Sequence, residues 1–237
     1  MSTTAQARLD GAVILYDNGI LPTLEPQLFE AGWLGENGYL RGGSRGRFEA
    51  HFIEFAGHEL VLRHFNRGGL IGRFNRDAYF RTGQGRSRAM QEFRLLDMMR
   101  AQGLAVPRPV AARYAPRGLV YRADIITVRI PNARTLAEIL HEQCLSEEIW
   151  AGIGAAIQKM HTIEVFHSDL NYRNIMIDDR GVVWLIDFDK CKQRAPGAWM
   201  QGNLDRLERS LNKAAAGPNE LNWSPADWDA LRAGYAS

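Results

Sequence analysis

The chain has 237 residues, enough to bury a substantial core as one large domain or as two lobes. With 46% hydrophobic residues, 24% charged residues and a net charge of +2, its composition is that of a globular protein and excludes a low-complexity or disordered chain. Two cysteines, Cys144 and Cys191, exclude a disulfide framework and fit a reducing cytosol, and we expect no signal peptide and no membrane span.

Residues 1–35 predict an N-terminal extension with a strand at 12–16 and a short helix. A glycine-dense turn is expected next, at 38–47, where backbone N–H groups can approach phosphates because no Cβ is in the way. Taken alone this pattern fits a plain hairpin turn equally well, but the motif further along favours a phosphate-covering loop. The glycines expected to lie near a nucleotide are Gly42, Gly43 and Gly46.

Arg63 and Glu92, further along the chain, are candidates for the basic–acidic pair of a kinase. Residues 59–63 predict a strand whose Leu-Val-Leu-Arg resembles the Val-Ala-Ile-Lys strand of protein kinases, with Arg63 at the lysine position. Arginine can bind phosphate as a bidentate fork, although Arg63 could also be a surface residue at a strand end. Residues 87–102 predict a helix capped by Ser87. In a kinase that helix supplies a glutamate, here Glu92, which is otherwise an ordinary exposed residue.

Arginine and aromatic side chains are interleaved between residues 64 and 88, where Asp77 is the only acid. Such a segment can be solvated surface. It also suits single-stranded nucleic acid, or an anionic phospholipid surface, at which each basic residue contributes about 1 kcal/mol. The pattern by itself does not separate these partners.

The most specific pattern in the chain begins at His167 and reads His-x-Asp-Leu-x-x-x-Asn, followed by Asp-Phe at residues 187–188. This arrangement is typical of the phosphoryl-transfer site of kinases. Asp169 is the candidate base that takes the proton of an acceptor hydroxyl. Asn174 and Asp187 are the candidate ligands of Mg²⁺ bound to ATP.

A hairpin is expected between these metal ligands, because two apolar runs at 175–177 and 182–186 flank a polar turn. The hairpin would bring Asn174 and Asp187 together. A helix at 146–161 leads into the motif, and we expect His167 to brace the loop by hydrogen bonding rather than to act as the base.

Two features separate the chain from regulated protein kinases. Ser168 stands where protein kinases commonly have an arginine that grips an activation-loop phosphate, and no Ala-Pro-Glu or long activation segment follows Asp189. Both features favour a small-molecule or lipid-headgroup kinase.

Four stretches together resemble the 3-deoxy-D-manno-octulosonic acid (Kdo) kinases of the lipopolysaccharide kinase group: residues 62–70, 167–176, 186–190 and 203–213. The resemblance covers nearly the whole chain in order. It implies an α+β, protein-kinase-like fold with a β-rich N-terminal lobe at 1–128 and, after a hinge, a mainly helical C-terminal lobe at 129–237. It also implies transfer of phosphate from ATP, with Mg²⁺, to the 4-hydroxyl of Kdo on a lipid A precursor.

The resemblance further implies a peripheral membrane protein at the cytoplasmic face of a Gram-negative inner membrane, with segment 64–88 in contact with the membrane. We expect neither nucleic acid nor an obligate protein as a partner. Another kinase-fold small-molecule phosphotransferase, such as a heptose kinase or an aminoglycoside- or sugar-type phosphotransferase, is the first alternative. The basic segment argues against the acidic pockets of the antibiotic enzymes. The second alternative is a binding protein with a degenerate kinase fold, and the intact Asp169, Asn174 and Asp187 argue against it.

Overall fold

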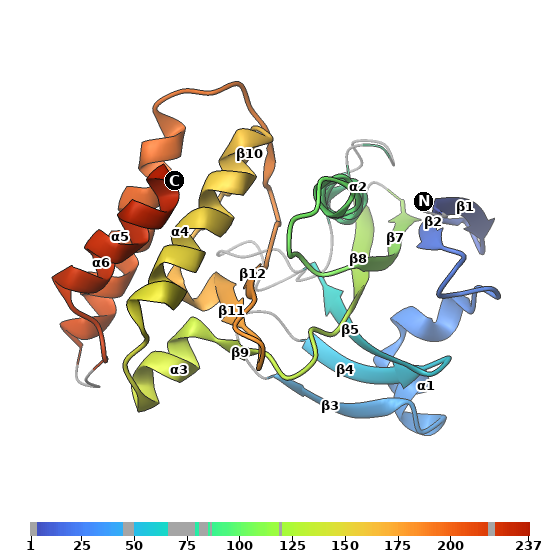
Figure 1. Cartoon of the computed structure of the whole chain (residues 1–237). Helices are drawn as coiled ribbons and strands as arrows, with labels where there is room; N and C mark the ends of the chain where they lie inside the picture. The colour runs from blue at the N-terminus through green and yellow to red at the C-terminus, as the bar shows by residue number, and fades with distance from the viewer. Residues whose placement is uncertain are drawn as a thin grey trace. The chain divides into compact units, whose positions relative to one another are not determined.

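The computed structural model describes residues 4–44, 50–65, 79–80, 85, 87–118, 120–217 and 221–237. These divide into two compact units, which are treated separately below: Met1–Asp97 with Arg108–Arg129, and Met98–Pro107 with Ile130–Ser237. The first is built mainly of strands and the second mainly of helices (Figure 1). The lobe boundary expected between residues 128 and 129 stays a prediction.

An antiparallel sheet organises the first unit, in the order β1-β2-β7-β8-β5-β4-β3, with β6 also paired to β8. Its described strands are β1 (Thr4–Leu9), β2 (Ala12–Asp17), β3 (Leu40–Ser44), β4 (Ala50–Phe55), β5 (His58–His64), β6 (Tyr79–Phe80), β7 (Pro109–Arg117) and β8 (Val120–Val128). Strands β7 and β8 form the long hairpin at its centre.

The strand and the short helix predicted in residues 1–35 are present, but the strand belongs to this sheet, so only their description as an extension is wrong. Strands β1 and β2 form a hairpin, and β2 pairs with β7. The reason lies in β2, where the consecutive residues Val13, Ile14 and Leu15 are all buried and therefore need apolar neighbours on both faces of the strand. If residues 1–35 were attached to the outside of the unit, only one face of β2 would have apolar neighbours.

The core of the first unit lies between the sheet and two short helices, η1 (Pro26–Phe29) and α1 (Ala31–Glu36). Leu28, Phe29 and Leu34 from these helices are fully buried in one cluster with Leu60 and Leu62 of β5. Helix α2 (Arg88–Ala101) begins one residue after its predicted cap, and the Ser87 Oγ accepts a hydrogen bond from Met90 N (3.3 Å).

Helices dominate the second unit, and most begin where local capping chemistry predicts. They are α3 (Leu136–Glu142), α4 (Glu147–Thr162), α5 (Trp199–Ala215) and α6 (Pro225–Ala236). Ser146 caps α4, and Thr135 and Ser224 form capping boxes at α3 and α6. The short elements are β9 (Arg134–Thr135), β10 (Val165–Phe166), η4 (Tyr172–Asn174), β11 (Ile175–Ile177), β12 (Val183–Leu185) and β13 (Lys192–Gln193).

Strands β11 and β12 pair antiparallel, which confirms the hairpin expected between the candidate metal ligands. Strand β13 pairs with β10, just before the His-x-Asp motif. Among the described residues, no helix combines the length and the apolar character needed to cross a membrane.

Helices α4 and α6 lie side by side (Figure 1) and approach each other through glycines. A Cβ at Gly154 would lie 2.0 Å from the Leu231 carbonyl oxygen, and one at Gly234 would lie 2.0 Å from the Ala151 carbonyl oxygen. Both positions therefore need glycine, because any side chain would push the two backbones apart.

Replacing Gly154 with alanine is expected to lower the free energy of unfolding by about 1–3 kcal/mol through this overpacking. Gly202→Ala on α5 is the matched control, because a Cβ there meets nothing within 4 Å. The control should leave the protein as stable or stabilise it by about 0.5–1 kcal/mol, since alanine is the better helix former. Chemical denaturation measures both; equal effects would contradict the glycine contact.

Candidate active site

The structure places Gly42 and Gly43 in strand β3, so the prediction of a turn throughout 38–47 is wrong for these two residues. Gly43 is needed for strand pairing, because a Cβ there would lie 2.7 Å from the Ala50 carbonyl oxygen on β4. Gly42 has a φ of 134°, in the region that favours glycine, next to an irregularity in the β3–β4 register. Gly46 lies outside the described residues. The role of these glycines at a phosphate stays a prediction.

Arg63 and Glu92 form the ion pair expected in a kinase-like site. Arg63 Nη2 lies 2.6 Å from Glu92 Oε1 and 2.8 Å from Oε2. Glu92 is buried rather than an exposed helix residue, and a buried carboxylate requires such a partner. The Arg63 guanidinium also lies over the Phe65 ring, 5.7 Å from its centroid, so both charge and stacking direct this side chain.

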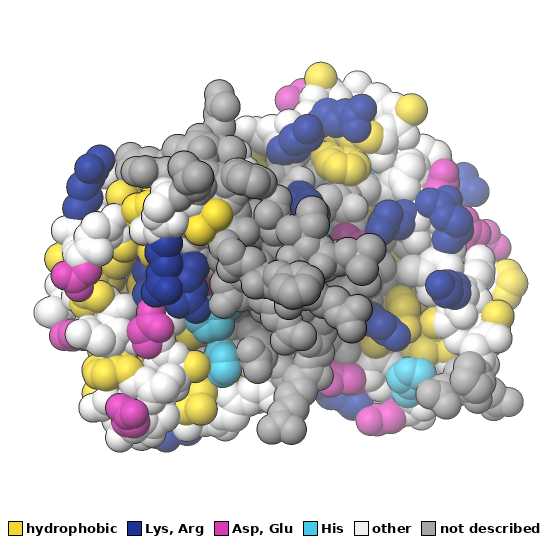
Figure 2. Space-filling model, turned by 180° about the vertical axis from the view of Figure 1, so that it is seen from behind, with side chains coloured by type: hydrophobic (Ala, Val, Ile, Leu, Met, Phe, Trp, Pro, Cys, Tyr) yellow, Lys and Arg dark blue, Asp and Glu magenta, His cyan; other side chains and the backbone are white. Residues whose placement is uncertain are grey.

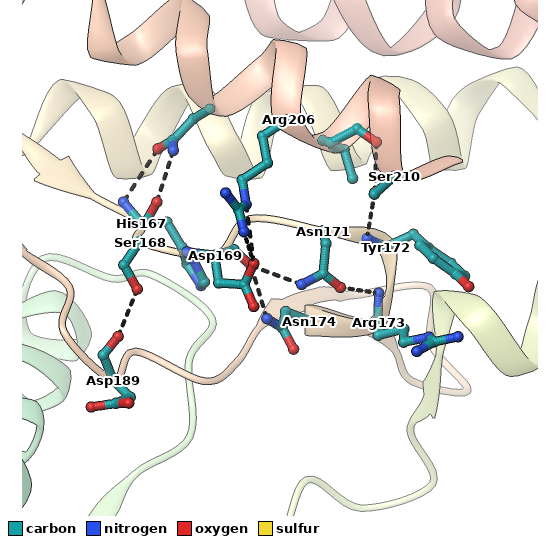
Figure 3. A network of polar contacts seen from close by, with 12 residues as sticks. His167, Ser168, Asp169, Asn171, Tyr172, Arg173, Asn174, Asp189, Arg206 and Ser210 are labelled. Atoms are coloured by element: carbon teal, nitrogen blue, oxygen red, sulfur yellow. Dashed lines mark hydrogen bonds and ion pairs between the residues drawn. The ribbon is translucent and has the colours of Figure 1, made fainter. Parts of the chain in front are cut away.

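The loop after β10 is organised around the Asp169 carbonyl oxygen (Figure 3). It accepts hydrogen bonds from Asn171 Nδ2 and Asn174 Nδ2, both at 2.9 Å. Asn171 Oδ1 in turn accepts from Arg173 N (2.9 Å) and so caps helix η4. Asn174 Nδ2 donates to the Asp169 carbonyl oxygen, so the other amide atom of Asn174, Oδ1, is directed away from that carbonyl.

The β11–β12 hairpin connects Asn174 to Asp187. Ile186 N donates to the Asn174 carbonyl oxygen (3.0 Å), which places the next residue, Asp187, beside Asn174. Asp187 has a φ of 63°, a left-handed conformation that costs free energy in a non-glycine residue and is concentrated at functional sites. The ends of the hairpin are thus brought together as its sequence predicts.

The donor chemistry of these two residues fits Mg²⁺, which prefers oxygen ligands. Within the described residues, no group of three or more His, Cys, Asp and Glu side chains could hold a metal ion. A site made of one amide oxygen and one carboxylate matches the usual magnesium site of phosphate-transferring enzymes, in which the nucleotide and water supply the remaining ligands.

His167 braces the loop with both ring nitrogens. The backbone N–H of Asp169 donates to Nδ1 (3.2 Å), so the ring hydrogen is on Nε2, which donates to the Ile186 carbonyl oxygen (3.1 Å). Burial lowers the pKa of His167, although the Ile186 carbonyl opposes this effect. A neutral, buried imidazole with both nitrogens engaged is suited to hold the loop and poorly suited to take a proton from a substrate.

The loop is held to helix α5 by Asn203, for which the sequence predicted no role. Asn203 Oδ1 accepts from His167 N (3.2 Å), and its Nδ2 donates to the His167 carbonyl oxygen (2.8 Å). His161 Nε2 also lies 3.3 Å from Asn203 Oδ1, and His161 Nδ1 lies 2.8 Å from the Tyr235 hydroxyl. One polar network therefore connects the loop that carries Asp169 to α4, α5 and α6.

Two further side chains of α5 reach the same loop and were also missed (Figure 3). Arg206 Nε donates to Asp169 Oδ1 (3.0 Å), and its Nη2 contacts the same oxygen. The Ser210 hydroxyl oxygen accepts from Tyr172 N (3.3 Å). Polar residues at positions 203, 206 and 210, interleaved with buried leucines, were the available signal that one face of the helix serves the loop.

Ser168 connects the loop to the segment after Asp187. Its hydroxyl donates to the Asp189 carbonyl oxygen (2.7 Å), and its backbone N–H donates to Cys191 Sγ (3.2 Å). The serine that departs from the protein-kinase pattern thus makes a direct contact between the candidate base and metal-binding segments.

Asn203→Leu should leave the His167 N–H and carbonyl groups without their buried partners, at a cost of about 1–3 kcal/mol for each unsatisfied group. The expected result is a lower free energy of unfolding and a loss of phosphoryl transfer. Gln201→Leu, on an exposed part of α5, is the control, and its free energy of unfolding should stay within about 0.5 kcal/mol of that of the wild-type protein. Unaltered stability and turnover in Asn203→Leu would contradict the fastening role.

Burial lowers the pKa of His161 from 6.5 to about 4; its hydrogen bond with Asn203 opposes this, and nearby His167 adds to it. Below pH 6.5 the unfolded chain therefore binds a proton at His161 that the folded chain does not, so the unfolding free energy should fall as the pH drops from 6.5 to about 4.

His161→Gln removes this titration and should make the slope shallower, by at most about 1.4 kcal/mol per pH unit. Denaturant unfolding at several pH values measures the slope, and parallel curves for the two proteins would contradict a neutral His161 in the folded state.

Comparisons with known proteins, like the geometry of the site, indicate a kinase. The lipopolysaccharide kinase (Kdo/WaaP) family matches residues 31–235. The 3-deoxy-D-manno-octulosonic acid kinase of Vibrio cholerae serotype O1 is 42% identical over 211 residues, covering 89% of each chain. The protein of the same name from Photobacterium profundum is 39% identical over 226 residues, covering 95% of each chain.

Among solved structures, a crystal structure of WbdD matches with a TM-score of 0.52 at 16% identity, and a co-crystal structure of WbdD with the kinase inhibitor LY294002 matches with a TM-score of 0.51. Each match covers 83% of this chain but less than half of the WbdD chain, 45% and 44% respectively, and shows the fold alone. The predicted α+β, protein-kinase-like fold is confirmed, and the chain belongs to the lipopolysaccharide kinase (Kdo/WaaP) family.

Proposed function

We propose that this chain is a 3-deoxy-D-manno-octulosonic acid kinase, which transfers phosphate from ATP to the 4-hydroxyl of Kdo on a lipid A precursor. The observation that carries the proposal is the single loop-and-hairpin unit that presents Asp169, Asn174 and Asp187 together in a member of this family. Relatives that cover about nine tenths of the chain bear that name.

Asp169 is proposed as the base. The acceptor oxygen attacks the γ-phosphorus of ATP, the bond from that phosphorus to the bridging oxygen breaks, and the acceptor proton passes to the carboxylate of Asp169. Its carbonyl oxygen accepts hydrogen bonds from the side chains of Asn171 and Asn174, which fixes the proposed base relative to one proposed metal ligand. His167 holds this loop in place without taking part in proton transfer.

Asn174 Oδ1 and the Asp187 carboxylate are proposed to hold Mg²⁺. When bound, the ion neutralises the charge on the phosphate oxygens of the nucleotide. Arg63, directed by Glu92, is proposed to bind nucleotide phosphate, and Gly42, Gly43 and Gly46 to cover it with backbone N–H groups.

The acceptor is an anionic, amphiphilic glycolipid, so we propose that the protein works peripherally at the cytoplasmic face of the inner membrane. Most of segment 64–88, proposed to contact that surface, lies outside the described residues. On the face shown in Figure 2, the Lys and Arg side chains of the described residues lie in several separate groups, with acidic side chains close to many of them. Neither nucleic acid nor an obligate protein partner enters the proposed reaction.

Purified protein with Mg-ATP should phosphorylate a Kdo–lipid A precursor in preference to a heptosylated core, an aminoglycoside and a protein substrate. Asp169→Asn should lower kcat by about 10²–10⁴-fold, because the base is lost while ATP affinity is kept. Asp179→Asn, an exposed carboxylate in the hairpin turn, is the matched control and should keep turnover.

Transfer of labelled phosphate measures these activities, and nucleotide titration measures binding. Phosphate appearing only on the other acceptors would overturn the proposed substrate. Full turnover by Asp169→Asn would overturn the proposed base.

A further inference from the structure

The ion pair between Arg206 and Asp169 has a geometry that stability does not explain. Both donors of the pair, Arg206 Nε (3.0 Å) and Nη2, contact one oxygen, Asp169 Oδ1 (Figure 3). The two side chains are each 49% exposed. Solvent competes with an ion pair at such a site, so it contributes little to folding. Its position directly at the proposed base points to the reaction.

The pair leaves a hydrogen-bonding edge of Arg206 available. A guanidinium has five N–H donors, and two of them are directed at Oδ1. No described residue accepts a hydrogen bond from the remaining donors, which lie on Nη1 and Nη2. Two parallel N–H groups of this kind match the two oxygens of a carboxylate, so the edge can hold an acid while the other donors hold Asp169.

The proposed acceptor carries such an acid close to the reacting oxygen. In a 3-deoxy-2-ulosonic acid the carboxylate is carbon 1, which is three bonds along the carbon chain from carbon 4 and its hydroxyl. Asp169 must contact that hydroxyl to take its proton, and the Arg206 guanidinium is hydrogen-bonded to Asp169. The acceptor carboxylate therefore comes within reach of Arg206 whenever the hydroxyl is in place.

We infer that Arg206 is the specificity-determining residue of the acceptor site, binding the sugar carboxylate with its outer edge while it holds Asp169 Oδ1. This inference rests on the proposed function. Asp169 Oδ2 is left for the acceptor hydroxyl, so one side chain aligns the base and selects the sugar that the base acts on. A neutral sugar loses the charged contact and is bound less well.

The test compares two acceptors, the Kdo–lipid A precursor and the same glycolipid with its Kdo carboxylate converted to a neutral carboxamide. The original protein should favour the acid by about 10–100-fold in kcat/KM, the range for a hydrogen bond to a charged group. Arg206→Met should reduce this ratio to about one, through a raised KM for the acid. Arg206→Lys keeps the charge without the planar fork and should give an intermediate ratio.

Arg209→Met is the matched control, because Arg209 is exposed on the same helix and donates to no described residue. It should keep the full preference for the acid. Thermal unfolding of all three variants checks that they are folded, and Arg206→Lys supplies the comparison if Arg206→Met is not.

Three results would contradict the inference or its basis. An equal loss of kcat with both acceptors in Arg206→Met would mean that Arg206 acts only through Asp169. Equal use of acid and carboxamide by the original protein would overturn the role of Arg206 while leaving the proposed function intact. Phosphorylation of neither acceptor, with transfer to another sugar, would overturn the proposed function and the acceptor assigned to Arg206 with it.

Discussion

One amide side chain holds the backbone of one residue, His167, at the start of the loop that carries Asp169 and Asn174, and the position of that loop depends on this contact. Asn203 both accepts from the His167 N–H and donates to the His167 carbonyl, which a carboxylate or a hydroxyl could not do with the same geometry. The loop that follows has little regular backbone pairing, so its position depends on such side-chain contacts. Asp169, Asn174 and the start of the β11–β12 hairpin are all placed relative to this anchor.

The anchor depends in turn on helix packing. Glycines at 154 and 234 let α4 and α6 approach closely enough for the Tyr235 hydroxyl to reach His161, 2.8 Å away. His161 then meets Asn203 in a buried setting where each hydrogen bond is protected from water. Gly154 and Gly234 thereby contribute to the alignment of the candidate base Asp169, through a continuous series of packed and hydrogen-bonded groups.

Local chemistry explains what the sequence predicted well. Helix starts at Ser87 and Ser146, and the hairpin between Asn174 and Asp187, follow from caps and turns within a few residues. The Arg63–Glu92 pair followed from a known motif. Asn203, Arg206 and Ser210 were missed because their partners lie 36–38 residues earlier in the chain, beyond any local rule. The turn predicted for Gly42 and Gly43 was wrong because close strand pairing, rather than a turn, requires the glycine at Gly43.

The bond from the Ser168 hydroxyl to the Asp189 carbonyl has a consequence for control. Both groups are uncharged, and both belong to the folded chain itself, so the contact forms when the protein folds and needs no added phosphate. An arginine at this position would instead leave a positive charge that waits for a modified partner. Within the described residues, the link between the loop of the candidate base and the segment of the candidate metal ligand is therefore constitutive.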